Sequence, residues 1–199
     1  MFICIASGVV FNSLIVQTVV SWSALIDGFV RQGQPRSALR HFVQMQEEGV
    51  VPDEATFSSA LRACKAVEFI EQGKLLHDKI IRREFDIGFI LGTTIVDMYA
   101  KLGYLSEARC VLDNMPTKNV VSWGAMISGY TAHGFPDLAI ETFWEMQHQG
   151  LKSDKSTFVC TLKSCTTLGA IHMGMLLHHN LMAESLESDV LLGTSLIDM

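Results

Sequence analysis

The residue types in this chain best suited to chemistry are its five cysteines and seven histidines. They form no C-x-x-C pair and no set with zinc-finger spacing, and an odd number of cysteines disfavours a disulfide framework. A zinc deaminase would require an H-x-E motif with a downstream C-x-x-C, because three ligands must leave one position for the attacking water. Neither motif occurs, nor does a glycine-rich phosphate loop or a G-x-S-x-G elbow. We therefore predict no catalysis by this chain, no metal and no other cofactor.

The spacing of these residues indicates a duplication instead. Cys64 and Cys165 are 101 residues apart, as are His77 and His178. When the sequence is shifted by 101 residues from Val19 onward, 29 of 80 aligned pairs are identical and no gap is needed. Each pair therefore occupies one repeat position twice, and we interpret these cysteines and histidines as packing residues of a repeat.

A weaker similarity at a shift of 70 residues divides the period into units of three kinds. We predict units at 1–18 (the tail of an earlier unit), 19–53, 54–88, 89–119, 120–154, 155–189 and 190–199 (a broken unit). Within the unit 19–53, apolar residues at helical spacing stop at Gly33 and Pro35 and then resume until Gly49 and Pro52. No segment alternates convincingly as a strand. The predicted fold class is all-α, a solenoid in which stacked helix-turn-helix repeats share a continuous core.

Composition and charge limit the classes of function. The chain is 49% hydrophobic and 18% charged, which is typical of a folded domain. Its formal charge of -6 gives no overall attraction to nucleic acid, so any phosphate-binding site would have to be a local stripe. The uncharged segment before Asp27 could be a signal anchor or a transmembrane helix. It lacks a basic region, contains several polar residues and aligns with a charged segment one period later, which disfavours the membrane.

The repeat resembles the pentatricopeptide repeat family, in the plant-type subclass whose arrays alternate three motif lengths. The standard motif is matched by 19–53, with Val19-Val20-Ser21-Trp22 and Val51-Pro52-Asp53, and again by 120–154. The long motif is matched by 54–88, with Thr56-Phe57, Cys64, Glu71-Gln72-Gly73 and His77. The short motif is matched by 89–119, with the segment Ile95 to Lys101 and Asn114-Met115-Pro116.

This resemblance implies a right-handed superhelix that binds single-stranded RNA sequence-specifically in mitochondria or chloroplasts. In that subclass the usual task is to direct cytidine-to-uridine editing, for which accessory proteins of the editing complex would be further partners. It implies no membrane association and no small-molecule substrate, and a deaminase domain, where relatives have one, follows the repeats. The alternative is a protein-binding scaffold like a tetratricopeptide array. Such a scaffold should show one uniform length of 34 residues and a W-x-x-L-G-x-x-Y spacing, which this chain lacks.

In the family, the fifth and the last residue of a motif read one base. Carried onto this chain, Ser23 with Asp53 implies guanine, because a hydroxyl and a carboxylate can bond to the edge of that base. Thr93 with Asn119 implies adenine by the same carry-over. The remaining residues of this kind are Gly124 with Asp154, where glycine has no side chain to donate a bond, and Thr194, which suggests a purine. The long units, with Ser58 and Gly88 or Val159 and Asp189, imply no base.

The resemblance assigns two further roles. An apolar second residue packs against the base face, at Val20, Ile90, Val121 and Leu191. Arg31 and Lys101 occupy the position of a phosphate-contacting lysine, whereas Ala132 breaks that pattern. Both the base-reading residues and the cations have a simpler alternative. A polar residue near a helix end is more often a helix cap, and an exposed cation is often only solvated. Trp22 and Trp123 lie on the apolar stripe, and we predict that they pack between helices.

Overall fold

Short helices joined by tight turns account for all the regular structure in residues 18–83 and 89–183, the ranges described by this computed structural model. The side chains of residues 178 and 180–183 lie outside that description. The helices are α2 (Val19–Arg31), α3 (Pro35–Glu47), α4 (Glu54–Ala66), α5 (Ile70–Arg82), α6 (Phe89–Lys101), α7 (Leu105–Asn114), α8 (Val120–Ala132), α9 (Pro136–His148), α10 (Lys155–Leu168) and α11 (Ile171–Ala183). The predicted all-α class is confirmed.

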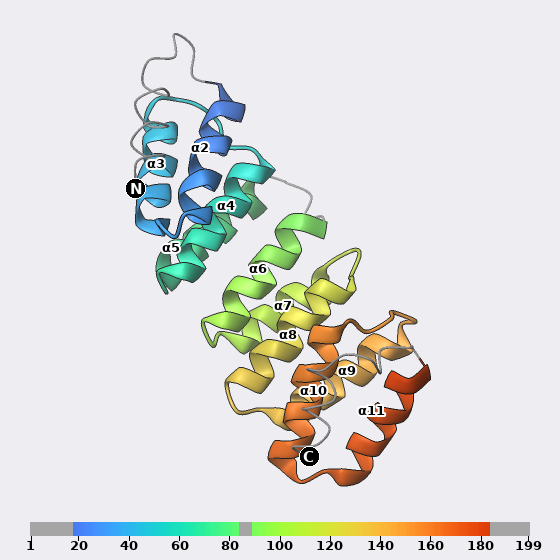
Figure 1. Cartoon of the computed structure of the whole chain (residues 1–199). Coiled ribbons are helices and arrows are strands. Elements are labelled where there is room, and N and C mark those ends of the chain that lie inside the picture. The colour runs from blue at the N-terminus through green and yellow to red at the C-terminus, as the bar shows by residue number, and fades with distance from the viewer. Residues whose placement is uncertain (1–17, 84–88, 184–199) are drawn as a thin grey trace. The chain divides into compact units, whose positions relative to one another are not determined.

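The chain divides into two compact units, residues 1–98 and 99–199, and the division falls within α6. In the first unit α2 packs against α3 and α4, and α4 packs in turn against α3 and α5 (Figure 1). In the second unit α8 and α10 have the same relations to α9, and α11 packs against α10. Within each unit, consecutive hairpins therefore share a core: α2–α3 with α4–α5, and α8–α9 with α10–α11. This is expected for a repeat in which no single hairpin can bury its apolar face.

The core consists of the apolar stripes that the helical spacing predicts. In α2 the buried residues are Trp22, Leu25, Ile26 and Phe29. Phe42 of α3 meets Phe57 of α4 with ring centroids 5.7 Å apart, and the equivalent rings of α9 and α10 are 5.5 Å apart. Such an aromatic pair contributes about 0.5–1.5 kcal/mol beyond the burial of its area. These ring pairs fasten the second helix of one hairpin to the first helix of the next.

The helices begin by two different devices. A side-chain cap on the third residue of the helix starts each of α2, α4, α8 and α10, and the capping residues are Thr18, Asp53, Asn119 and Asp154. The second helices α3, α5, α7 and α9 have no side-chain cap, but α3 and α9 begin with Pro35 and Pro136. Proline suits that position because its missing N–H would find no partner within the helix. Both prolines lie where the chain turns between the two helices of one hairpin, and the break predicted at Pro35 is confirmed.

The hairpin turns share one closure, and one of them lacks glycine. A glycine with positive φ closes the turns that follow α2, α3, α6, α8, α9 and α10, whereas the α4–α5 turn has Glu68 with φ 57°. The next residue, Phe69, donates its N–H to the Cys64 carbonyl at 3.0 Å. This is the pattern of a Schellman motif, in which glycine is the usual left-handed residue. Glu68 therefore holds a left-handed conformation that costs a residue with a Cβ atom about 1–2 kcal/mol.

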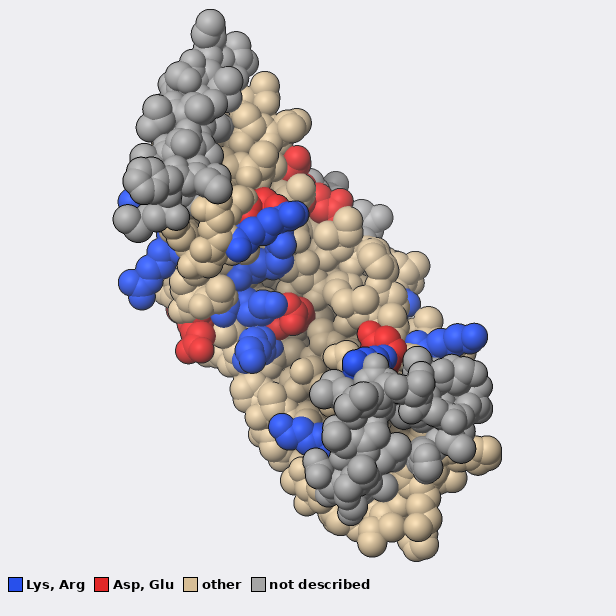
Figure 2. Space-filling view, viewed as in Figure 1, with Lys and Arg blue, Asp and Glu red and all other residues tan. Residues whose placement is uncertain are grey.

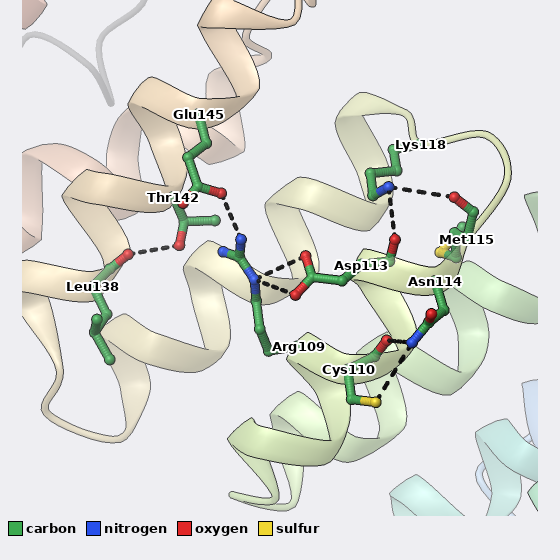
Figure 3. A network of polar contacts seen from close by, with 9 residues as sticks. All are labelled: Arg109, Cys110, Asp113, Asn114, Met115, Lys118, Leu138, Thr142 and Glu145. Carbon is green, nitrogen blue, oxygen red and sulfur yellow. Dashed lines mark hydrogen bonds and ion pairs between the residues drawn. The ribbon is translucent and has the colours of Figure 1, made fainter.

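The second unit contains a cation that ties three helices together. Arg109 on α7 donates from Nη2 to Glu145 on α9 at 2.7 Å and from Nε to both carboxylate oxygens of Asp113 at 3.0 and 3.1 Å (Figure 3). Its guanidinium carbon lies 5.8 Å from the centroid of the Trp123 ring on α8. Burial alone would lower the pKa of Arg109, but the bonds to Glu145 and Asp113 outweigh it and raise that pKa.

The helix α7 is shorter than the other second helices, with 10 residues against 13 in α3, α5 and α9. Lys118 ends it by donating from Nζ to the carbonyls of Asp113 at 3.1 Å and Met115 at 3.3 Å (Figure 3). The Asn114 amide donates to the Cys110 carbonyl at 2.8 Å. The last carbonyls of a helix have no partner within it, so the bond from Lys118 to the Asp113 carbonyl stabilises the early stop.

We predict that Glu68→Gly raises the free energy of unfolding by about 1 kcal/mol, because glycine adopts the left-handed conformation without strain. Urea denaturation followed by circular dichroism measures it. The matched control is Gly169→Glu, which introduces the same strain at the position one period later, where φ is 64°. A lower stability of Glu68→Gly would show that the glutamate side chain contributes more than its backbone strain costs.

Candidate nucleic-acid interface

A hydrogen-bonded cluster joins the two residues expected to read a base in the unit 19–53. The Ser23 hydroxyl donates to Asp53 Oδ1 at 3.1 Å and lies 2.5 Å from the Thr56 hydroxyl. Thr56 donates to the same Oδ1 from its backbone N–H at 2.8 Å and from its hydroxyl at 2.5 Å. Three donors therefore converge on one carboxylate oxygen, and Oδ2 takes no part in these bonds.

The charge of Asp53 is stabilised where it lies. Burial alone would raise the pKa of Asp53, but the hydrogen bonds from Thr56 and Ser23 outweigh it and lower that pKa below its ordinary value. The carboxyl is therefore ionised near neutral pH, held in position by Thr56 and directed at Ser23.

The capping interpretation of the last-position residues is confirmed. Asp53 caps α4, and Asn119 accepts from the Ser122 N–H at 2.7 Å at the start of α8. Asp154 accepts from the Thr157 N–H at 2.8 Å at the start of α10. Because the cap holds each side chain at the junction between two hairpins, capping and a role toward a ligand do not exclude one another.

The equivalent cluster of the second unit lacks one member. Asp154 and Thr157 repeat the geometry of Asp53 and Thr56, but Gly124 stands where the first copy has Ser23. A Cβ atom at Gly124 would meet only the Thr157 methyl, at 3.5 Å, which is ordinary van der Waals contact. The space for a side chain is therefore present although the side chain is missing.

Thr93 carries a polar atom that the described residues leave unsatisfied. Its hydroxyl oxygen is buried and has no hydrogen-bond partner among them. An unpaired buried hydroxyl costs about 1–3 kcal/mol, so such an atom calls for a ligand, an ordered water or an ion. Thr93 and Asn119 belong to one repeat unit, 89–119, but Thr93 lies in the first compact unit (residues 1–98) and Asn119 in the second (residues 99–199). Their pairing at one base stays a prediction.

The residues expected to stack on bases are exposed where they are described. Val20 is 75% exposed, Val121 54% and Ile90 53%, although each is apolar; each is the second residue of its helix. Single exposed apolar residues are common, but these recur at the second position of three units, 19–53, 89–119 and 120–154. Leu191 and Thr194 lie outside the described residues.

A groove in the first unit gathers several of these residues. It has a volume of about 670 Å³, and Val20, Ser23, Arg31, Asp53 and Ile90 all contribute to its walls. Apolar, carboxylate and cationic side chains thus face the same space. Lys101, expected to contact phosphate in the unit 89–119, has an exposed side chain at the end of α6.

Other residues of this groove escaped the sequence reasoning. Asp27, Ser59 and Arg62 also line it, and Arg62 Nη2 donates to Asp27 at 2.5 Å and to Ser59 at 3.0 Å. The available signal was the duplication, because Lys163 stands one period after Arg62 and is also a cation. Figure 2 shows basic side chains close to acidic ones on one face of the first unit. The charge there is mixed rather than uniformly positive.

Four of the residues interpreted as packing residues are buried, whereas His77 is only partly buried and the side chain of His178 lies outside the description. Trp22 and Trp123 are on the apolar stripes of α2 and α8 and have almost no exposed surface. Cys64 and Cys165 are buried too, and burial raises the pKa of the Cys64 thiol to about 12. In the part of the chain that the structure describes, no group of His, Cys, Asp and Glu side chains could hold a metal ion. None of the helices in that part is both long and apolar enough to cross a bilayer.

Family models match three stretches of the chain. A model described as PPR repeat family matches residues 17–66 and 118–167, and a model described as PPR repeat matches residues 93–120. Together they cover more than half of the sequence. The chain belongs to the pentatricopeptide repeat family.

Pentatricopeptide repeat-containing proteins of Arabidopsis thaliana are similar along most of this chain. One is 33% identical over 168 residues, which is 84% of this chain and 34% of that protein. Another, described as chloroplastic, is 37% identical over 165 residues, which is 83% of this chain and 20% of that protein. The chain thus spans about a fifth to a third of the length of these curated relatives.

Solved pentatricopeptide repeat structures share the fold. The chain matches the pentatricopeptide repeat protein PPR10 from maize, solved in complex with an 18-nucleotide psaJ RNA element, with a TM-score of 0.75. That match has 14% identity and covers 96% of this chain and 28% of the other. The PPR domain of Arabidopsis thaliana protein-only RNase P 1, solved in complex with tRNA, matches with a TM-score of 0.67 and 15% identity, over 83% of this chain and 88% of that one.

We predict that Asp53→Asn lowers the free energy of unfolding by about 1 kcal/mol at neutral pH, because hydrogen bonds to a charged acceptor are stronger than those to an amide. The variant keeps an oxygen that can cap α4. Since the folded-state pKa of Asp53 is lowered, the stabilisation by its charge is present above the unfolded-state pKa, about 4, and is lost as the pH falls through the folded-state value.

The difference between the parent chain and Asp53→Asn should therefore shrink on acidification. Urea denaturation at neutral pH and at several acid pH values measures it. A difference that stays constant with pH would mean that the charge of Asp53 does not stabilise the fold.

Proposed function

We propose that this chain binds single-stranded RNA, with the groove of the first unit holding one base and its phosphate. The observation that carries this proposal is the convergence of Val20, Ser23, Asp53 and Arg31 on that groove. An apolar side chain offers a surface for a base face, hydroxyl and carboxylate groups offer bonds to its edge, and a cation offers a bond to phosphate. Single-stranded RNA is recognised through these three kinds of contact.

The chemistry of the Ser23 and Asp53 pair favours guanine. The Watson–Crick edge of guanine presents two neighbouring N–H groups, and an ionised carboxylate accepts without donating. Asp53 is ionised and holds Oδ1 in three bonds, which leaves Oδ2 for the base. The Asn119 side-chain amide both donates and accepts hydrogen bonds. This suits adenine, whose Watson–Crick edge presents one amino group as donor and one ring nitrogen as acceptor.

The exposed valines and isoleucine support the same assignment. Val20, Ile90 and Val121 each extend apolar surface into solvent at the second position of a unit. Burying that surface against a base removes it from water, at about 25 cal/mol per Å². Val20 and Ile90 line the groove that also holds Asp53. Base stacking and base reading are therefore supported by one site.

The relatives support RNA as the class of ligand. The maize protein and the Arabidopsis RNase P domain were both solved with RNA bound. We further propose that the chain recognises a site of cytidine-to-uridine editing in a mitochondrion or chloroplast, with accessory editing proteins as partners. This proposal is supported by the alternation of three unit lengths and by relatives described as chloroplastic.

We predict that Asn119→Asp shifts the base preference of the unit 89–119 from adenine toward guanine by about tenfold, which corresponds to one well-placed pair of base contacts. Competition binding with short single strands that differ at that one base measures the shift. Aspartate remains a good helix cap, so α8 should be unaffected. RNA binding without the shift would disprove the base assignment, whereas no RNA binding at all would favour a protein-binding scaffold.

We predict that Gly124→Ser strengthens binding to a strand with guanine at the position read by the unit 120–154. The new hydroxyl would complete, with Asp154 and Thr157, the equivalent of the cluster that Ser23 forms with Asp53 and Thr56. The new Cβ atom has room beside Thr157. Gly124→Ala is the matched control, since it fills the same space without a hydroxyl. Both variants raise helix propensity. An equal gain from serine and alanine would show that the hydroxyl does not contact the base.

A further inference from the structure

One carboxylate in the groove of the first unit lies between two guanidinium groups. Asp27 on α2 accepts from Arg31 Nε at 2.6 Å through Oδ2 and from Arg62 Nη2 at 2.5 Å through Oδ1. Ser59 also accepts from Arg62 Nη2, at 3.0 Å. The three charged side chains therefore carry a net positive charge, and Asp27 holds Arg62 of α4 beside Arg31.

Arg62 is not engaged at every donor. Its bonds to Asp27 and Ser59 both run through Nη2, while its side chain is 39% exposed and lines the groove. A guanidinium presents five N–H donors in a planar fork that fits a phosphate. The arrangement thus offers donors of a positioned cation to an anion in the groove.

The second copy of the repeat shows that the cation recurs without its carboxylate. Lys163 occupies the position of Arg62 one period later, but Ser128 replaces Asp27 and Ala132 replaces Arg31. Lys163 is exposed on α10 and forms none of the ion pairs found among the described residues. An explanation by ion pairing between α2 and α4 covers one copy only, whereas a contact with a ligand covers both.

The repeat units that contain Arg62 and Lys163 have no cation at the position where the unit 19–53 has Arg31, the expected phosphate contact. The position of Arg31 corresponds to Ala66 in the unit 54–88 and to Thr167 in the unit 155–189. Neither side chain can neutralise a phosphate. Arg62 and Lys163 are cations at one shared repeat position, and they can supply a positive charge in units where the usual position supplies none.

We propose that Arg62 and Lys163 contact RNA phosphates for the units 54–88 and 155–189, and that Asp27 is a positioning residue that orients Arg62 toward the groove. This inference rests on the proposed RNA binding. Contacts to phosphate add affinity without sequence preference and give it a dependence on salt. The two residues thus differ from Ser23 and Asp53, which act on base identity.

The test measures binding of the full chain to a fluorescein-labelled single strand of uridines and to a strand of equal length with the predicted bases. The variants are Arg62→Gln and Lys163→Gln, with Arg40→Gln as the matched control, because Arg40 is exposed on α3 and does not line the groove. Fluorescence anisotropy at salt concentrations between about 50 and 200 mM gives the affinity and its salt slope.

Each glutamine variant should weaken binding to both strands about three- to tenfold at the lowest salt and reduce the salt slope by about 0.7, the value for one phosphate contact on a single strand. Arg40→Gln should change neither quantity beyond the small effect of net charge. Arg62→Lys should restore the salt slope, since it keeps the charge. Thermal denaturation of each variant identifies any loss of folding, and Lys163→Gln removes no ion pair of the described residues.

Suppose that the parent chain binds RNA and that Arg62→Gln and Lys163→Gln bind it as Arg40→Gln does. That result would overturn this inference and leave the proposed RNA binding in place. A loss of preference for the predicted bases with an unchanged salt slope would also overturn it, because a base contact would then be the role of these cations. No binding of either strand by the parent chain would instead remove the proposed function itself.

Discussion

The structure depends on the fact that a two-helix hairpin of this length cannot bury its apolar stripe by itself. The ring contact between Phe42 of α3 and Phe57 of α4 solves this by placing one core between consecutive hairpins, and Phe143 with Phe158 repeats it. Everything else follows from the need to stack. The first helices α2 and α4 are brought side by side, so the residues on their shared edge face one groove.

The junction between hairpins is where folding and the proposed recognition meet. Asp53 ends one hairpin, caps the first helix of the next and accepts a bond from Ser23 of the preceding first helix. Three hydrogen bonds hold Oδ1 of this capping carboxylate, so its second oxygen is already positioned for the base contact that we propose. Preorganisation of this kind lowers the entropy lost on binding. The same residue thus stabilises the stack and presents an acceptor to the groove.

Sequence reasoning predicted the helices, the turns and the buried stripes because these depend on local chemistry. Helical spacing identified Trp22 and its buried neighbours, and Pro35 and Pro136 marked where the second helix of a hairpin begins. It did not identify Arg62 or Ser59, because their importance comes from Asp27 on another helix rather than from their own neighbours in the chain. It also did not single out Glu68, whose positive φ follows from the closure of a turn that uses glycine elsewhere.

The sequence by itself determined the repeat, its period and the positions that recur, because a duplicated chain repeats its local propensities wherever it lies. It also determined which polar residues recur at unit ends. Only the tertiary structure decided which polar side chains from different helices meet: Ser23 with Asp53 and Thr56, and Asp27 with Arg62. The physical reason is that these contacts join residues about thirty positions apart, and their distances are set by how two hairpins pack, which no single segment of the chain encodes.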